Sequence, residues 1–204
     1  MGRPTLGRGE TSHGFYNSSG KYKTRVAGIK TQACRLWENI RVRCQLLPKI
    51  EESRFRNYES VDIWEEWLDF QNFAEWFSTV PYYQDGWELD KDLLSGEHKI
   101  YSPYTCIFLP PELNKILNVK KSSRGNLPLG MSRHSDGKID VSFRCQNPNF
   151  CVRVLVSDED IHKGFSIYKS AREGYVRWLT EEYAELLDPR AYKILSDYKI
   201  TIED

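Results

Sequence analysis

Three consecutive charged residues, Asp90, Lys91 and Asp92, lie between leucines in the stretch "LDKDLL" at residues 89–94. Charged side chains are costly to bury unless they are paired or bind an ion. The triplet therefore suggests a metal site, a lysine-centred catalytic site or a turn closed by an ion pair. Carboxylate oxygens are the ligands that Mg²⁺ prefers, whereas a lysine acts as a base only where its surroundings lower its pKa from about 10.4.

The chain around the triplet, from Leu89 to Leu117, predicts a strand, a loop, a second strand and a helix. The apolar run at Thr105–Leu109 predicts the second strand, and Pro110-Pro111 favours the start of a helix over Glu112–Leu117. This order corresponds to a compact ββα unit.

A ββα unit can present a carboxylate from its first strand and an amide from its helix to one divalent cation, here Asp90 or Asp92 together with Asn114. In phosphodiester hydrolysis such an ion neutralises charge on the scissile phosphate and stabilises the leaving oxygen, while a nearby base activates water. Two structural alternatives remain open. The first alternative is that the triplet forms a surface turn with a local ion pair. The second is that Asn114 is an ordinary polar helix residue.

The net charge of zero hides four blocks of alternating sign. Residues 1–60 carry twelve Lys/Arg and five Asp/Glu, whereas residues 61–114 carry two and eleven. Residues 115–155 carry eight Lys/Arg and two Asp/Glu, and residues 156–204 carry seven Lys/Arg and eleven Asp/Glu. Basic flanks that hold phosphates around an acidic centre that holds a cation are typical of a nucleic-acid enzyme. A plain alternation of acidic and basic helices is the other explanation.

The composition is that of a globular chain of 204 residues, with 40% hydrophobic and 28% charged residues. No apolar run reaches membrane-spanning length, and the first residues lack the apolar core of a signal peptide. The five cysteines contain no Cys-x-x-Cys pair, which argues against a structural zinc site or a disulfide framework and favours buried free thiols. We therefore expect a cytoplasmic protein.

The predicted fold class is α+β. We expect an irregular arm over residues 1–30, a domain over 31–119, a linker over 120–128 and a domain over 129–204. Two helices should precede the ββα unit, one from Thr31 to Pro48 and one over the aromatic-rich stretch 61–78. After the linker we expect three short strands, a helix from Ser157 to Ala184 with Ser157 as N-cap, and a last helix in "DPRAYKILSDY".

The stretch "WELDKDLLSGEHKIYSPYTCIFLPPELN" resembles the signature of bacteriophage HNH-type endonucleases, many of which are homing endonucleases. Upstream, Trp37 followed by Arg43-Cys44 and the stretch "WEEWLDFQNFAEWF" resemble the same family. Downstream, "LPLGMSRHSDGKIDVSFRC" and "SIYKSAREGYV" resemble the APETALA-type DNA-binding module of three strands and a helix, which accompanies these nucleases. The resemblance covers most of the chain from about residue 31 onward.

The resemblance implies that Asp90 is the strand ligand and Asn114 the helix ligand of one Mg²⁺ or Mn²⁺ ion. Lys91 occupies the place where typical HNH enzymes have their general-base histidine. The chain also departs from the family at "SGEHK", where Glu97-His98 replace Gly-Asn. A loop imidazole at His98 could supply the base that Lys91 does not, or His98 is simply an exposed loop residue.

Arg133, Lys138, Arg144 and Arg153 are the expected DNA contacts of the C-terminal module. Strand alternation places Val141, Phe143 and Cys145 on one face of the predicted sheet and leaves the opposite face to polar residues. A basic sheet surface can contact both phosphates and base edges in a groove of double-stranded DNA. A solvated sheet face is the alternative.

The leading hypothesis is a metal-dependent DNA endonuclease that needs no organic cofactor and, if a phage encodes it, acts in the host-cell cytoplasm. The second is a non-catalytic DNA-binding or regulatory protein derived from such a nuclease. The third is a protein-interaction factor whose acidic centre mimics DNA or binds a basic partner.

Overall fold

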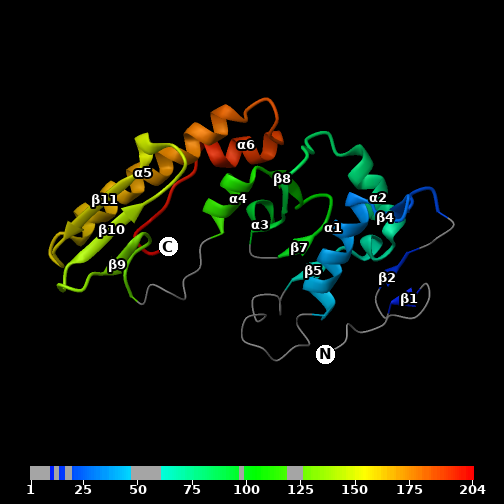
Figure 1. The fold of residues 1–204 in the computed structure, drawn as a ribbon, viewed down its shortest axis with the longest axis horizontal. Helices are drawn as coiled ribbons and strands as arrows, with labels where there is room; N and C mark the ends of the chain where they lie inside the picture. The colour runs from blue at the N-terminus through cyan, green and yellow to red at the C-terminus, as the bar shows by residue number, and fades with distance from the viewer. Residues whose placement is uncertain (1–9, 12–13, 17–19, 47–60, 97–98, 119–125) are drawn as a thin grey trace. The chain divides into compact units, whose positions relative to one another are not determined.

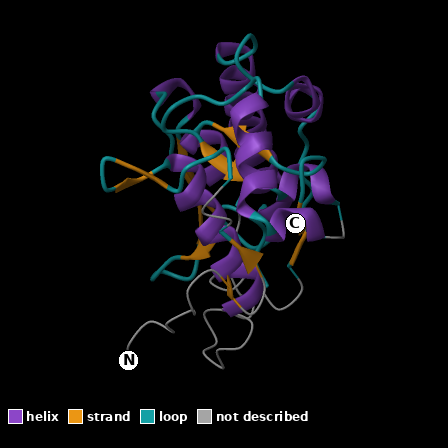
Figure 2. Ribbon diagram, turned by 90° about the vertical axis from the view of Figure 1, so that its right-hand side faces the viewer, coloured by secondary structure: helices purple, strands orange, loops and turns teal. Residues whose placement is uncertain are grey.

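The computed structural model describes residues 10–11, 14–16, 20–46, 61–96, 99–118 and 126–204. It divides the chain into two compact units, Met1–Phe108 and Leu109–Asp204. Helices and strands occur in both units, as the labels of Figure 1 and the purple and orange ribbons of Figure 2 show. The predicted α+β class is confirmed.

The first unit opens with short hairpins, within the stretch that we expected to be an irregular arm. Strand β1 (Glu10–Thr11) pairs with β2 (Gly14–Phe15), and β3 (Arg25–Val26) pairs with β4 (Ile29–Lys30). Helix α1 (Gln32–Arg41) follows and continues as a turn of π-helix, η1 (Val42–Leu46).

Helix α1 begins where the sequence predicts it. The Thr31 hydroxyl accepts the backbone N–H of Cys34 at 3.3 Å, which satisfies one of the otherwise unpaired donors of the first turn. Trp37 and Ile40 form part of its buried stripe. The predicted end at Pro48 lies outside the described residues.

The single helix predicted over residues 61–78 is wrong in its first half. That half contains strand β5 (Asp62–Ile63) and a 3₁₀ turn, η4 (Glu65–Leu68), and helix α2 begins only at Phe70 and ends at Thr79. Strand β5 pairs in parallel with β7 (Ile100–Tyr101). These hydrogen bonds come from a distant segment, and they outweigh the local helical periodicity.

The core of the first unit is aromatic. Trp37, Trp67, Phe70 and Phe73 are fully buried. The indole Nε1 of Trp37 donates to the backbone carbonyl of Trp67 at 2.6 Å. Edge-to-face contacts join Trp37 to Phe70, with ring centroids 5.6 Å apart, and Trp67 to Phe73, with centroids 5.0 Å apart.

The elements around the charged triplet follow the predicted order of strand, loop, strand and helix. Strand β6 (Glu88–Asp90) pairs with β8 (Ile107–Leu109), and the loop between them contains the short helix α3 (Asp92–Ser95) and β7. Helix α4 (Pro111–Leu117) begins with the proline at its first position, as predicted. Helix α4 belongs to the second unit.

The second unit contains a three-stranded antiparallel sheet in the order β11-β10-β9, with one face covered by helix α5 (Figure 1). Its strands are β9 (Met131–Arg133), β10 (Ile139–Phe143) and β11 (Val152–Val156), and η6 (Pro148–Phe150) lies in the loop before β11. The three predicted strands are therefore confirmed.

Helix α5 (Ile161–Glu182) approaches the sheet closely at Gly164, where a Cβ atom would lie 2.9 Å from Cγ2 of Val141 and 3.1 Å from Cγ2 of Val156. The predicted N-cap at Ser157 is wrong. The cap is Asp160, and the Ser157 hydroxyl donates to its carboxylate at 3.1 Å instead of capping the helix.

The last predicted helix is confirmed as α6 (Pro189–Ser196). The Asp188 carboxylate caps it by accepting the backbone N–H of Arg190 at 2.9 Å. Among the described residues, no helix combines the length and the apolar character that crossing a membrane requires.

A buried carboxylate, Glu173 on α5, ties the C-terminal segment to the second unit. It is 5% exposed and accepts the backbone N–H of Ile200 at 2.9 Å and the Lys199 ammonium at 3.3 Å. Lys169 lies 3.3 Å away on the same helix. Burial by itself raises the pKa of Glu173, but these donors outweigh it, so the pKa lies below its usual value.

We expect Glu173→Gln to destabilise the protein by about 1.5–3 kcal/mol at pH 7, the range for hydrogen bonds to charged groups. Because the folded-state pKa is the lower one, this stabilisation is complete above the unfolded pKa of about 4.3 and is lost as the pH falls through the folded value. Urea unfolding of both proteins between pH 3 and pH 7 measures the difference. Glu182→Gln, at an exposed position of α5, is the control. A difference that does not shrink at low pH would contradict the assignment.

Candidate functional site

Asp90 is the last residue of β6, and its carboxylate lies where the chain leaves the strand for α3. It is 5% exposed. One of its oxygens, Oδ1, accepts the backbone N–H of Leu93 at 2.8 Å, which fixes the side chain against the first turn of α3. The leucines on either side of the triplet thus belong to two different elements rather than to one charged strand.

Lys91 is buried next to Asp90, with 5% of its surface exposed. Its ammonium donates to Oδ1 of Asp92 at 2.6 Å and lies 5.4 Å from the centre of the Tyr101 ring. The Asp92 side chain is 41% exposed, and its Oδ1 is also 3.6 Å from the ammonium of Lys99. The ion pair that the sequence offered as one alternative therefore forms between Lys91 and Asp92, and it leaves Asp90 apart.

Burial raises the pKa of the Asp90 carboxyl, and the charge of Asp92 acts in the same direction. The N–H of Leu93 and the ammonium of Lys91 lower it, but by less. The surroundings of Asp90 thus compensate its charged form only in part. A buried carboxylate of this kind fits a hard divalent cation, which would supply the missing positive charge.

Tyr101 and Arg43 complete the surroundings of Lys91, and neither was a candidate from its residue type. The Tyr101 hydroxyl accepts a hydrogen bond from Nη1 of Arg43 at 3.0 Å. Burial raises the pKa of Tyr101 to about 12, so the phenol stays protonated at neutral pH. Arg43-Cys44 and "YSP" were already part of the family resemblance, and that was the signal available in the sequence.

The five cysteines are free thiols. Cys34 and Cys106 are buried as expected, whereas Cys44 and Cys145 are half-buried and Cys151 is exposed. Burial raises the pKa of Cys44 to about 12 and that of Cys106 well above its usual value. The two thiols near Lys91 are thus protonated at neutral pH and are poor nucleophiles.

Asn114 is half-buried on α4, and its side-chain oxygen accepts the Nδ2–H of Asn118 at 2.9 Å. It belongs to the second unit and the charged triplet to the first. His98 lies outside the described residues. In the part of the chain that the structure describes, no three His, Cys, Asp or Glu side chains form a group that could hold a metal ion.

The four expected DNA contacts lie around the sheet of the second unit, and all four are exposed. Arg133 pairs with Asp158, with Nη1 at 2.9 Å from Oδ1, and Arg153 pairs with Asp140, with Nη2 at 2.7 Å from Oδ2. Arg153 and Asp140 lie on the face of the sheet opposite α5, where the alternation also places Lys138 and Arg144. This face is mixed in charge rather than uniformly basic.

Comparison with protein-family models, with curated proteins and with solved structures found no match to this chain.

Proposed function

We propose that the chain is a metal-dependent DNA endonuclease of the HNH type. The observation that carries the proposal is Asp90: a buried carboxylate with incomplete charge compensation, at the end of the first strand of a strand–loop–strand–helix segment. Carboxylates with perturbed pKa values are more frequent at functional sites than elsewhere. Asn114, on the helix of that segment, is the second ligand in the proposal.

Asp90 and Asn114 would hold one Mg²⁺ or Mn²⁺ ion. When bound, the ion supplies charge neutralisation at the scissile phosphate and at the leaving oxygen. The Lys91 ammonium donates one hydrogen bond to Asp92. An ammonium has three N–H donors, so in this proposal Lys91 also donates to a phosphate oxygen. We assign the general base to His98, because an imidazole is largely neutral at pH 7 and can accept the proton of a water molecule.

In this proposal, double-stranded DNA contacts the sheet face that carries Lys138, Arg144 and Arg153. Arg153 would exchange its half-buried partner Asp140, to which its Nε and Nη2 both donate, for a phosphate. Binding through phosphates weakens steeply as salt is added.

The deciding experiment is cleavage of supercoiled plasmid by the full chain with Mg²⁺, with Mn²⁺ and with EDTA. We expect cleavage only with metal and none in Asp90→Ala or Asn114→Ala. Glu88→Ala changes an exposed carboxylate on the same strand and is the matched control, with activity retained. Metal-independent cleavage, or full activity in Asp90→Ala, would overturn the proposal.

The same assay separates the two candidate bases. His98→Ala should remove the limb of the pH–rate profile that rises near the histidine pKa of about 6.5. Lys91→Met should lower the rate without moving that limb. DNA binding at low salt without any cleavage would instead support the second hypothesis, a non-catalytic DNA-binding protein.

A further inference from the structure

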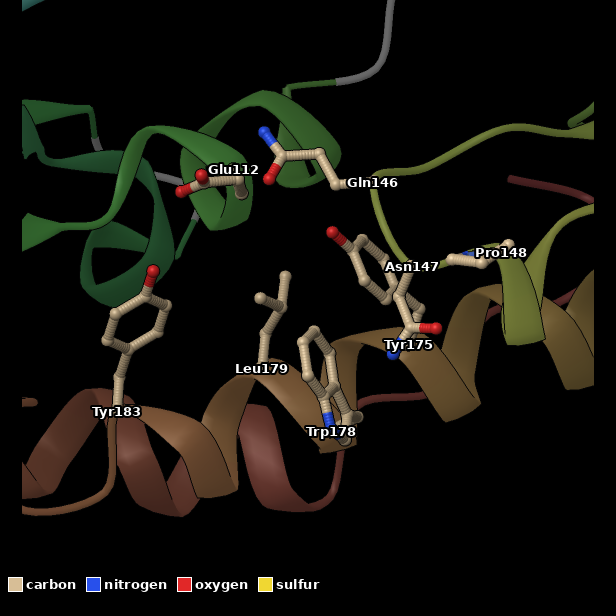
Figure 3. A pocket seen from close by; sticks show the side chains of 8 residues that line it. All are labelled: Glu112, Gln146, Asn147, Pro148, Tyr175, Trp178, Leu179 and Tyr183. Atoms are coloured by element: carbon tan, nitrogen blue, oxygen red, sulfur yellow. The ribbon is translucent and has the colours of Figure 1, made fainter.

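A cavity of about 380 Å³ lies within the second unit, between helix α4, helix α5 and the loop that joins β10 to β11 (Figure 3). It is distinct from the charged triplet, which belongs to the first unit. Its lining is formed by Glu112, Gln146, Asn147, Pro148, Tyr175, Trp178, Leu179 and Tyr183.

Aromatic rings form two of its walls. Tyr175 and Trp178 stack on each other on one side, with ring centroids 5.7 Å apart and planes inclined by 15°. Phe150 packs behind them, with its centroid 5.6 Å from that of Tyr175 and 6.1 Å from that of Trp178. Figure 3 shows Tyr183 on the far side of Leu179 from this pair. Although Trp178 is 36% exposed, its neighbours hold its ring in place.

Among the described residues that line the cavity, one side chain is charged, and it is a carboxylate. Glu112, in the first turn of α4, lies across the cavity from the α5 side chains (Figure 3). Burial raises the pKa of Tyr175 and of Tyr183, and the charge of Glu112 acts in the same direction on both.

The surroundings of the cavity are also negative. Helix α5 ends at Glu182, so its carbonyl end, the negative end of the helix dipole, lies next to Tyr183. The exposed carboxylates of Glu181, Glu182 and Glu185 are near in sequence. Ligands that carry a phosphate or carboxylate are therefore disfavoured, and a cation is favoured.

We propose that this cavity binds a methylated ammonium group, held by the ring faces of Trp178 and Tyr183 and by the charge of Glu112, with the buried Tyr175 stacked behind Trp178. Ring faces attract cations through their quadrupole, but they offer no lone pairs to an N–H group. A bare ammonium would lose its hydration there, whereas the methyl groups of a quaternary ammonium need no hydrogen bonds and pack on Leu179. The site is independent of the proposed nuclease chemistry.

The ammonium group can belong to a small molecule such as choline or to a trimethyllysine side chain of a protein. Calorimetric titrations of the full chain with choline and with a trimethyllysine peptide distinguish these two sources. The neutral isostere of choline, 3,3-dimethylbutan-1-ol, has the same shape without the charge. We expect choline to bind at least about tenfold more tightly than the alcohol, in line with a desolvated cation–π contact.

Two variants test the assignment of the residues. Trp178→Ala and Glu112→Gln should each weaken binding of the tighter ammonium ligand by about fivefold or more. Glu112→Gln keeps the shape of the side chain and serves if Trp178→Ala fails to fold. The control Glu159→Gln removes an exposed charge just before the opposite end of α5 and should change the affinity by less than about twofold, since salt screens it.

The proposal is overturned if choline and its neutral isostere bind equally, or if no ammonium ligand shows saturable binding. It is also overturned if a nucleoside such as cytidine binds in its place with the same dependence on Trp178, because the stacked rings would then accept a base. Tighter binding of the trimethyllysine peptide than of choline supports the proposal and identifies a protein partner.

Discussion

Asp90→Asn should give a protein that resists unfolding better than the wild type at pH 7 and yet lacks the proposed cleavage activity. Asp90 is 5% exposed, and burial raises the pKa of its carboxyl. The charged form is therefore a cost to the folded state at neutral pH. Asparagine removes the charge and keeps an oxygen that can accept the N–H of Leu93. A single stabilising substitution usually adds about 0.5–2 kcal/mol to the free energy of unfolding.

The pH dependence has a definite sign. The pKa of Asp90 in the folded state lies above the unfolded value of about 3.9, so the carboxyl favours folding only while it is protonated. The advantage of Asp90→Asn should therefore vanish below about pH 3.9 and grow as the pH rises through the folded-state pKa. Urea unfolding without divalent metal across this pH range measures it. Lower stability of the variant at pH 7 would show that the charge is fully compensated in the fold.

The same variant tests the proposed metal site by a readout other than cleavage. Mg²⁺ at a concentration well above its Kd should raise the unfolding temperature of the wild type, because a ligand that binds only the folded state stabilises it. It should leave Asp90→Asn unchanged. We expect cleavage by the variant to fall by about 100-fold or more, the range for removing one preorganised electrostatic group. Glu88→Gln, on the same strand, should keep the Mg²⁺-induced shift and the cleavage rate of the wild type.

Trp37→Phe should destabilise the protein more than Trp67→Phe, although both indoles are fully buried. The Nε1–H of Trp37 donates to the Trp67 carbonyl at 2.6 Å, and phenylalanine removes that donor. The Nε1–H of Trp67 is buried, and among the described residues it has no acceptor. Phenylalanine at position 67 therefore removes a donor that is costly to bury.

Both substitutions also leave part of the ring volume empty, so the two tryptophans share this cost. The difference between them should be about 1–3 kcal/mol, the cost of losing a partner for a buried polar group. Urea unfolding of the two variants at the same pH gives the two free energies. Equal losses would show that packing alone decides the contribution of these side chains.

Several elements follow from local sequence, because the forces that form them act between neighbours in the chain. The alternation around Val141 and the turn residues between the strands predict the sheet of the second unit, and Asp188-Pro189 predicts the start of α6. The order of strand, loop, strand and helix around Asp90 was predictable for the same reason, with boundaries that differ by a few residues.

Other features depend on residues that are far apart in the chain. Residues 61–69 have the periodicity of a helix, but pairing with β7 makes Asp62–Ile63 a strand. Residue types around Lys91 did not reveal that its ammonium is buried against Tyr101 and paired with Asp92 rather than Asp90. Burial is the main reason that the pKa of Asp90 is raised, and burial is a property of the fold.

The sequence by itself thus determined the α+β class, most of the elements and the residues with chemistry to offer. Only the tertiary structure decided which of those residues are buried, which are paired and which face one another. The cavity between Glu112 and Trp178 is the clearest case: these residues are ordinary in their own helices, and only packing of α4 near α5 makes them opposite walls. Hydrogen-bond periodicity is local, whereas desolvation and charge compensation depend on the whole surrounding structure.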